Sequence, residues 1–167
     1  MTLSELNSLS EEEFVDRVGL VMEDSPWVAA RAVKSRPFGS IEDLHEALTR
    51  EVEGSTDDEK LSLLRAHPDL GSRARMSKAS VGEQEQVGLD RLSADEYNTL
   101  LELNNRYKEK FGFPFIYAVK GSTKHDIMAA LRRRLESTEG VELNEALQQV
   151  FRIAEFRLDA IVSQGER

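Results

Sequence analysis

The sequence contains no cysteine, which excludes disulfide bonds, zinc sites built from thiolates and cysteine nucleophiles. It has three histidines, and neither His45 nor His125 has a second histidine at the spacing of a His-x-x-x-His pair, so we expect no transition-metal site. The glycine-rich nucleotide-binding motifs and the G-x-S-x-G motif of serine hydrolases are also missing. Nucleotide binding and serine hydrolysis therefore have no support in the sequence.

Basic residues are in the minority, with 22 Lys and Arg against 31 Asp and Glu, a net charge of −9. Nucleic acids and anionic membranes require a basic face, so we expect neither as a partner; the run "RRR" at 132–134 is the one candidate for a local basic patch. No apolar run approaches membrane length, and the N-terminus lacks the apolar core of a signal peptide. The last residues, "SQGER", carry no peroxisomal tripeptide, so we expect a cytoplasmic protein.

Apolar residues recur with the period of an α-helix along almost the whole chain. Phe14, Val18, Val21 and Met22 recur at i, i+4, i+7 and i+8, as on one face of a helix. With 167 residues, 40% of them hydrophobic, the chain is predicted to form a single all-α domain over 1–167. We expect about eight helices, the last over roughly 141–163, the others beginning near Ser10, Pro26, Ser40, Thr56, Ser80, Ser93 and Thr123.

One segment departs from the helical pattern. "FPFIYAV" at 113–119 is apolar and β-prone, lies between Gly112 and Gly121, and has no second strand with which to pair. We predict a short extended loop buried among the helices.

His67 is the first candidate for chemistry. It precedes Pro68, which disfavours helical geometry in the residue before it, so the helix from Thr56 should stop there. A histidine at that position can simply complement the carbonyl end of the helix dipole. It can also carry protons, because its ordinary pKa is close to neutral.

A polar helix face is predicted just downstream. Ser80, Glu83, Gln84 and Val87 are spaced at i, i+3, i+4 and i+7. Ser80 and Glu83 fit a capping box, but Gln84 is not explained by a cap. A hydroxyl, a carboxylate and an amide on one face can instead hold a small polar ligand.

Arg157 is the least expected residue of the last helix, since Val150, Ala154, Arg157 and Ile161 form one otherwise apolar row. Two interpretations stay open. The stem can pack while the guanidinium reaches water. Alternatively, the guanidinium can receive a carboxylate through its two-pronged geometry.

Four ordered motifs resemble the 2-oxo-4-hydroxy-4-carboxy-5-ureidoimidazoline (OHCU) decarboxylases, enzymes of urate breakdown that make (S)-allantoin. They are "HPDLG" at 67–71, S-x-x-E-Q-x-x-x-G-L at 80–89, N-x-x-Y-x-x-K-F-G-F-P-F-I at 104–116, and Ala146, Leu147, Ile153, Arg157 and Leu158 in the last helix. The resemblance implies an all-helical carboxy-lyase, a homodimer, that needs no cofactor. It implies that His67, Glu83 and Arg157 are catalytic. It also implies that the substrate-binding site is lined by Pro68, Ser80, Gln84 and the backbone of Phe115, Ile116, Tyr117, Ala118 and Val119.

Within that resemblance we hypothesise that Arg157 and Gln84 hold polar groups of OHCU. His67 would exchange a proton with the 4-hydroxyl, and Glu83 would help to deliver the stereospecific proton, directly or through His67. Two alternatives belong to other classes: a lyase or hydrolase acting on another ureido acid, and a non-catalytic all-α interaction module.

Overall fold

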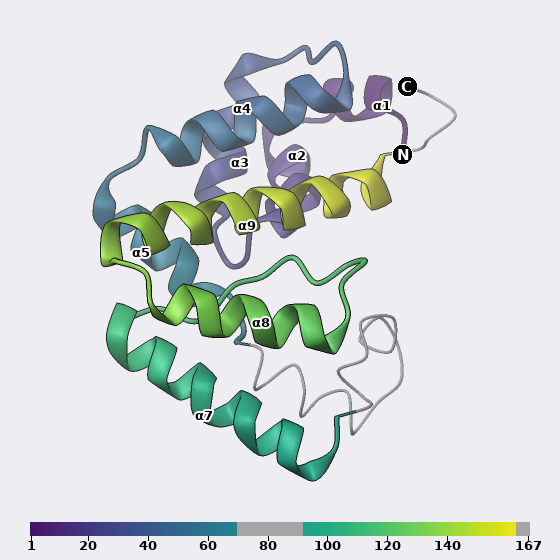
Figure 1. Ribbon diagram of the computed structural model, residues 1–167. Coiled ribbons are helices and arrows are strands. Elements are labelled where there is room, and N and C mark those ends of the chain that lie inside the picture. Colours follow the sequence, from purple (N-terminus) through teal and green to yellow (C-terminus); the bar gives the residue numbers. More distant parts are fainter. Residues whose placement is uncertain (70–91, 163–167) are drawn as a thin grey trace. The chain divides into compact units, whose positions relative to one another are not determined.

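A computed structural model of the chain describes residues 1–69 and 92–162 (Figure 1). These residues form eight α-helices and two short 3-10 helices, with no β-strand among them. The predicted all-α fold class is confirmed. The described residues group into two compact units: residues 1–66 with those from Val150 onward, and the residues between His67 and Gln149. The single-domain organisation over 1–167 stays a prediction.

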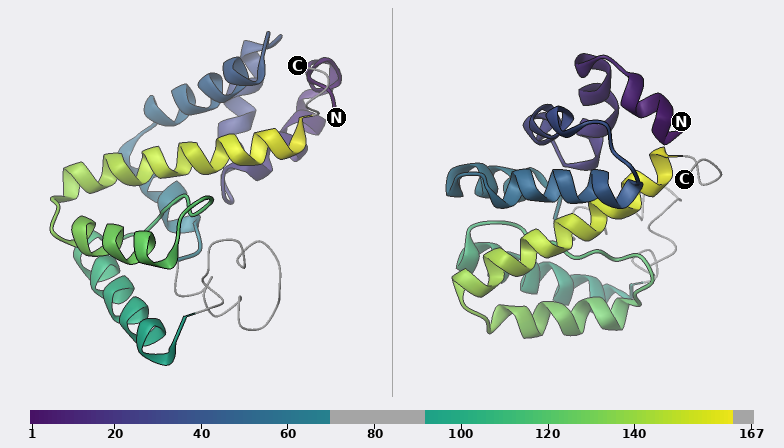
Figure 2. Two further views of the ribbon diagram at one scale, coloured as in Figure 1. Left: turned by 45° about the vertical axis from the view of Figure 1, so that its right-hand side comes forward. Right: turned by 90° about the horizontal axis from the view of Figure 1, so that it is seen from above.

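The first unit consists of five N-terminal helices and the C-terminal part of a long last helix. In it α3 packs against both α2 and α4 (Figures 1 and 2). The His45 imidazole of α4 donates from Nε2 to the Phe151 carbonyl of α9 at 2.8 Å. The helices are α1 Leu3–Ser8, α2 Glu11–Val18, α3 Pro26–Ala32, α4 Ile41–Glu53, α5 Asp57–Ala66 and α9 Glu139–Ile161; the 3-10 helices are Gly19–Val21 and Val33–Ser35.

The apolar row identified in the sequence forms part of the core of this unit. Phe14, Val18 and Val21 are fully buried, and Met22 is 1% exposed. The row does not continue as one α-helix, because α2 ends at Val18 and Gly19–Val21 form a 3-10 turn. The tighter turn still keeps Val21 and Met22 inside.

Most helix starts are set by side-chain caps that the sequence predicted. The hydroxyls of Ser10, Ser40, Ser93 and Thr123 each accept a hydrogen bond from the backbone N–H three residues later. One helix was missed. Thr2 and Glu5 form a reciprocal capping box that begins α1, which is only six residues long.

The second unit contains α7 Ala94–Phe111, α8 Lys124–Leu135 and the first part of α9. Helices α7 and α8 run in the same direction, as two contacts show. Lys124 pairs with Glu96 at 2.9 Å where both helices begin, and Lys110 Nζ donates to the Leu135 carbonyl at 2.6 Å where both end. The connection between them must therefore return along the helices (Figure 1). Gly112 starts this return with φ 78°, a conformation that favours glycine.

None of the described helices is both long and apolar enough to span a membrane.

Candidate active site

His67 directly follows α5, whose last residue is Ala66, so the predicted helix end is confirmed. Its side chain is buried, with 6% exposure, whereas Pro68 is exposed. Two residues later Asp69 pairs with Lys108 of α7 at 3.0 Å. This ion pair ties the turn that carries His67 to α7 within the second unit.

The segment 113–119 is an irregular connection, without helix or strand, in which every residue except Tyr117 is buried. The prediction of a short buried loop is confirmed. Its aromatic rings pack around Tyr107 of α7, whose ring centre lies 4.6 to 5.9 Å from those of Phe111, Phe113 and Phe115. Burial of these rings in the hydrophobic core of the unit holds the loop between α7 and α8.

A buried ion pair also holds this loop. Arg134 of α8 donates from Nε to the Glu142 carboxylate at 2.6 Å and from Nη1 to the Ile116 carbonyl at 2.7 Å. Its guanidinium lies 4.5 Å from the centre of the Phe115 ring. The exposed fractions of Arg134 and Glu142 are 3% and 1%, so both charges are removed from water and depend on each other.

Tyr107 completes this cluster. Its hydroxyl donates to the Glu142 carboxylate and accepts from Arg134 Nη2 at 3.3 Å. Burial raises the pKa of the Tyr107 phenol above its ordinary range; the hydrogen bond to Glu142 acts in the same direction and the Arg134 charge opposes it. The phenol therefore stays protonated and remains a donor at neutral pH.

Gln149 of α9 makes a second polar contact to the loop. Its Oε1 accepts from the backbone N–H of Ala118 at 2.9 Å, and its Nε2 donates to Glu145 at 3.0 Å. The side chain is 6% exposed. Two neighbouring peptide groups of the predicted substrate-binding loop are thus held by buried side chains of α8 and α9.

Arg157 lies in the first unit, on the C-terminal part of α9. Its Nη2 pairs with Glu23 at 2.6 Å, its Nη1 donates to the Val21 carbonyl at 3.3 Å, and its side chain is 36% exposed. The stem therefore packs while the charged head keeps partial access to solvent, as the first of the two interpretations holds. The guanidinium donates to the Glu23 carboxylate of the same unit, and its binding of a substrate carboxylate stays a prediction.

The other predicted site residues on the polar helix face, Ser80, Glu83 and Gln84, lie outside the described residues. So does the predicted helix that carries them.

The run 132–134 does not form a uniform basic surface. Arg132 and Arg133 are exposed, but Arg134 is buried and its charge is balanced by Glu142.

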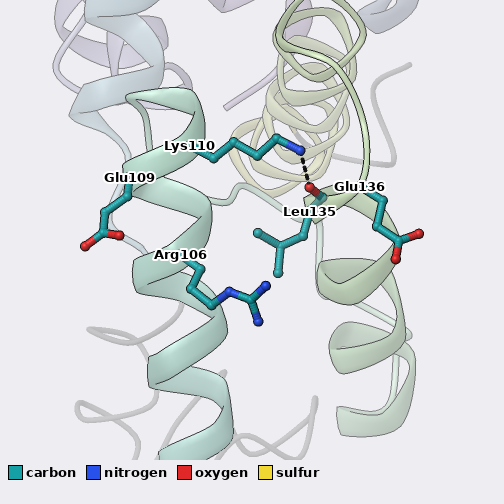
Figure 3. A pocket seen from close by; sticks show the side chains of 5 residues that line it. All are labelled: Arg106, Glu109, Lys110, Leu135 and Glu136. Carbon is teal, nitrogen blue, oxygen red and sulfur yellow. Dashed lines mark hydrogen bonds between the residues drawn. The ribbon is translucent and has the colours of Figure 1, made fainter.

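A surface pocket of about 430 Å³ lies between the C-terminal ends of α7 and α8 (Figure 3). It is lined by Arg106, Glu109, Lys110, Leu135 and Glu136, and Lys110 bonds across it to the Leu135 carbonyl. Its size would admit a small molecule. None of the predicted site residues lines it, so it is not the candidate active site. In 1–69 and 92–162 no group of three or more histidine and acidic side chains is placed to hold a metal ion.

The sequence reasoning missed the side chains that hold the loop, although a signal was present. Ile127, Leu131 and Arg134 are spaced at i, i+4 and i+7, the same pattern of an arginine in an apolar row that drew attention to Arg157. Glu142 and Gln149 likewise fall beside the buried Ala146 and Val150 of α9. A polar residue in an apolar row predicts a polar partner nearby, which is buried for Arg134 and half-exposed for Arg157.

Comparison with known proteins decides the family. The model of the family described as OHCU decarboxylase matches residues 7–159, nearly the whole chain. This protein belongs to the OHCU decarboxylase family. The resemblance carried by the four sequence motifs is thereby confirmed.

Relatives named OHCU decarboxylase match this chain over most of their own length. The chain is 48% identical over 158 residues to the OHCU decarboxylase of Haloferax volcanii, covering 95% of this chain and 94% of that protein. It is 38% identical to the OHCU decarboxylase of Xenopus laevis over 95% of this chain and 93% of the other. It is also 44% identical to a uric acid degradation bifunctional protein of Bacillus subtilis, over 99% of this chain but only 34% of that protein.

Solved structures of the OHCU decarboxylase fold are also similar. A crystal structure of (S)-allantoin synthase superimposes with a TM-score of 0.81 at 34% identity, over 97% of this chain and 54% of that one. A crystal structure of OHCU decarboxylase in the presence of (S)-allantoin gives a TM-score of 0.68 at 26% identity, over 84% and 93% of the two chains.

Proposed function

We propose that this protein is a carboxy-lyase that converts OHCU to (S)-allantoin and carbon dioxide in urate breakdown. The observation that carries the proposal is the similarity, along nearly the whole chain, to relatives named as this decarboxylase. The relatives named as bifunctional proteins of uric acid degradation support the same pathway.

The substrate itself can accept the electrons that the reaction releases. OHCU carries its carboxylate and a hydroxyl on C4, beside a ring C5=N bond. When the bond from C4 to the carboxylate breaks, its electron pair forms C4=C5, and the former C=N pair moves to the nitrogen, which takes a proton. The 4-hydroxyl then loses its proton as C4=O forms, and C5 gains a proton on one face. Because the ring is the electron sink, we propose a reaction without a cofactor.

The protein must therefore orient the carboxylate, remove the 4-hydroxyl proton and direct a proton to one face of C5. We assign the proton exchange with the 4-hydroxyl to His67 and the assistance in proton delivery to C5 to Glu83, acting directly or through His67. Arg157 and Gln84 hold the carboxylate and the ring. The remaining contacts to the substrate come from Pro68, Ser80 and the backbone of Phe115, Ile116, Tyr117, Ala118 and Val119. These assignments rest on the matching motifs, and the burial of His67 supports them because side chains that line a closed substrate pocket are largely shielded from bulk water.

The role of Arg157 can be separated from its contact with Glu23. We expect Arg157→Ala to lower kcat/KM by about 10²-fold or more, since it removes a preorganised positive group. Stability should fall by only about 0–1 kcal/mol, because the ion pair is partly exposed and screened by water. Enzyme kinetics and urea unfolding measure the two effects.

Glu23→Gln is the matched control for this experiment, because it breaks the same ion pair but leaves the guanidinium in place. We expect near-parental activity. An activity loss equal to that of Arg157→Ala would return Arg157 to a purely structural role.

We also propose a cytoplasmic homodimer, as the family resemblance implies. Sedimentation velocity distinguishes the dimer from a monomer.

Stereochemical product analysis tests the proposed function. OHCU also decarboxylates unaided and then yields both enantiomers, so substrate loss alone is ambiguous. With freshly generated OHCU we expect the protein to give optically active (S)-allantoin, followed by circular dichroism. A racemic product formed at the spontaneous rate would disprove the activity, and a panel of other ureido acids would then test the alternative lyase or hydrolase.

A further inference from the structure

Two buried side chains hold consecutive peptide groups of the loop 113–119 by contacts of opposite polarity. Arg134 donates to the carbonyl of Ile116 at 2.7 Å, and Gln149 accepts from the N–H of Ala118 at 2.9 Å. Their exposed fractions are 3% and 6%. These two contacts lie on either side of Tyr117 in the chain.

The planar geometry of the peptide bond relates these two contacts to the directions of the N–H and C=O of Tyr117. In a planar trans peptide the C=O of one residue and the N–H of the next point in opposite directions. Because the Ile116 carbonyl points to Arg134, the N–H of Tyr117 points away from Arg134. Because the Ala118 N–H points to Gln149, the carbonyl of Tyr117 points away from Gln149. Each of the two side chains thus fixes the direction of one backbone group of Tyr117.

Among the described residues the backbone N–H and C=O of Tyr117 have no hydrogen-bond partner, whereas the Ile116 carbonyl and the Ala118 N–H are each bonded to a side chain. Its side chain hydroxyl contacts Ser122 at 3.3 Å, and its ring stacks on Phe115 at 6.0 Å between centres. Tyr117 is the one half-buried residue of this otherwise buried loop, so a ligand or water can approach the donor and the acceptor of its backbone.

We propose that Arg134 and Gln149 are positioning residues that present the N–H and C=O of Tyr117 to the substrate. The inference rests on the proposed function, in which the backbone of 115–119 binds OHCU. An amide or urea edge carries a donor N–H beside an acceptor C=O, and the backbone of a single residue offers the complementary pair. OHCU has such edges in its ring and in its ureido group. The backbone of Tyr117 would thus bind this edge of the substrate. Arg134 and Gln149 would set the directions of its N–H and C=O.

Gln149 is the better of the two for an experiment, because Arg134 also balances the buried Glu142 charge. Gln149→Leu keeps the side-chain size but removes the acceptor for the Ala118 N–H. We expect kcat/KM to fall on the order of 10- to 100-fold, mainly through KM, since a misdirected contact loses binding geometry. Gln148→Leu, the same change at the exposed neighbouring residue, should leave both constants within about twofold of the parent.

A conservative exchange should restore the contact. In the double variant E145Q/Q149E the new carboxylate at position 149 can still accept from the Ala118 N–H and from the new amide at position 145. We expect it to recover most of the KM of the parent, which a general loss of stability would not predict. Thermal unfolding of each variant is measured alongside.

The backbone of Tyr117 supplies a second measurement that does not depend on turnover. In ¹⁵N-labelled protein, (S)-allantoin should shift the Tyr117 amide resonance, and Gln149→Leu should weaken that response. The positioning role is overturned if active parental enzyme shows no such shift, or if folded Gln149→Leu retains the parental KM. If instead the parental protein produces no (S)-allantoin, the proposed function itself fails.

Discussion

Replacing His67 with asparagine is expected to abolish enzymatic formation of (S)-allantoin while leaving the helical circular-dichroism spectrum unchanged. Asparagine keeps a hydrogen-bonding side chain of similar size but cannot exchange protons near neutral pH. Loss of such a proton carrier typically lowers the rate on the order of 10²–10⁴-fold. The measurement follows optical activity with freshly generated OHCU, because the unaided reaction yields a racemic product.

His125→Asn is the matched control, since His125 is an exposed residue in the first turn of α8. It should retain the parental rate. If His67→Asn also forms (S)-allantoin at the parental rate, the assignment of His67 as the proton carrier is wrong.

The second large effect concerns stability. Arg134→Met should lower the free energy of unfolding by roughly 3–5 kcal/mol, because it leaves the Glu142 carboxylate buried without its cation. It also removes the donor for the Ile116 carbonyl. Urea denaturation at neutral pH measures the change.

Two further variants test whether the loss of stability comes from the unpaired charge of Glu142. Arg133→Met, at the exposed neighbouring position, should change stability by no more than about 0.5 kcal/mol. The double variant R134M/E142L should recover much of the loss of Arg134→Met, since no unpaired charge then remains in the interior. Equal stability of the Arg134→Met and Arg133→Met proteins would contradict the structural role of the buried ion pair.

Local patterns predicted much of the fold because their physical causes are local. A hydroxyl that accepts from the N–H three residues later needs no distant partner, so Ser93 and Thr123 mark helix starts in the sequence as they do in the structure. The end of α5 before His67 follows in the same way from Pro68. Helix α1 was missed because its six residues are too few to show a periodic apolar face.

The two arginines in apolar rows show that local patterns do not predict interaction partners from other segments. The spacing of Arg134 and of Arg157 predicts that each lies beside buried residues. It does not predict which group each side chain contacts. In the structure Arg134 is enclosed with Glu142 and Tyr107, whereas Arg157 remains 36% exposed and pairs with Glu23. Their sequence patterns are similar, yet their environments differ because the partners come from other segments.

By itself, then, the sequence determined the all-α class, most helix boundaries, the buried loop at 113–119 and, through its four motifs, the family. Only the tertiary structure decided that Arg134 and Gln149 hold that loop at Ile116 and Ala118, which directs the N–H of Tyr117 away from Arg134 and its carbonyl away from Gln149. The physical reason is that caps and periodicity act over three to four residues. The direction of a peptide group in an irregular segment is instead set by hydrogen bonds to helices elsewhere in the chain.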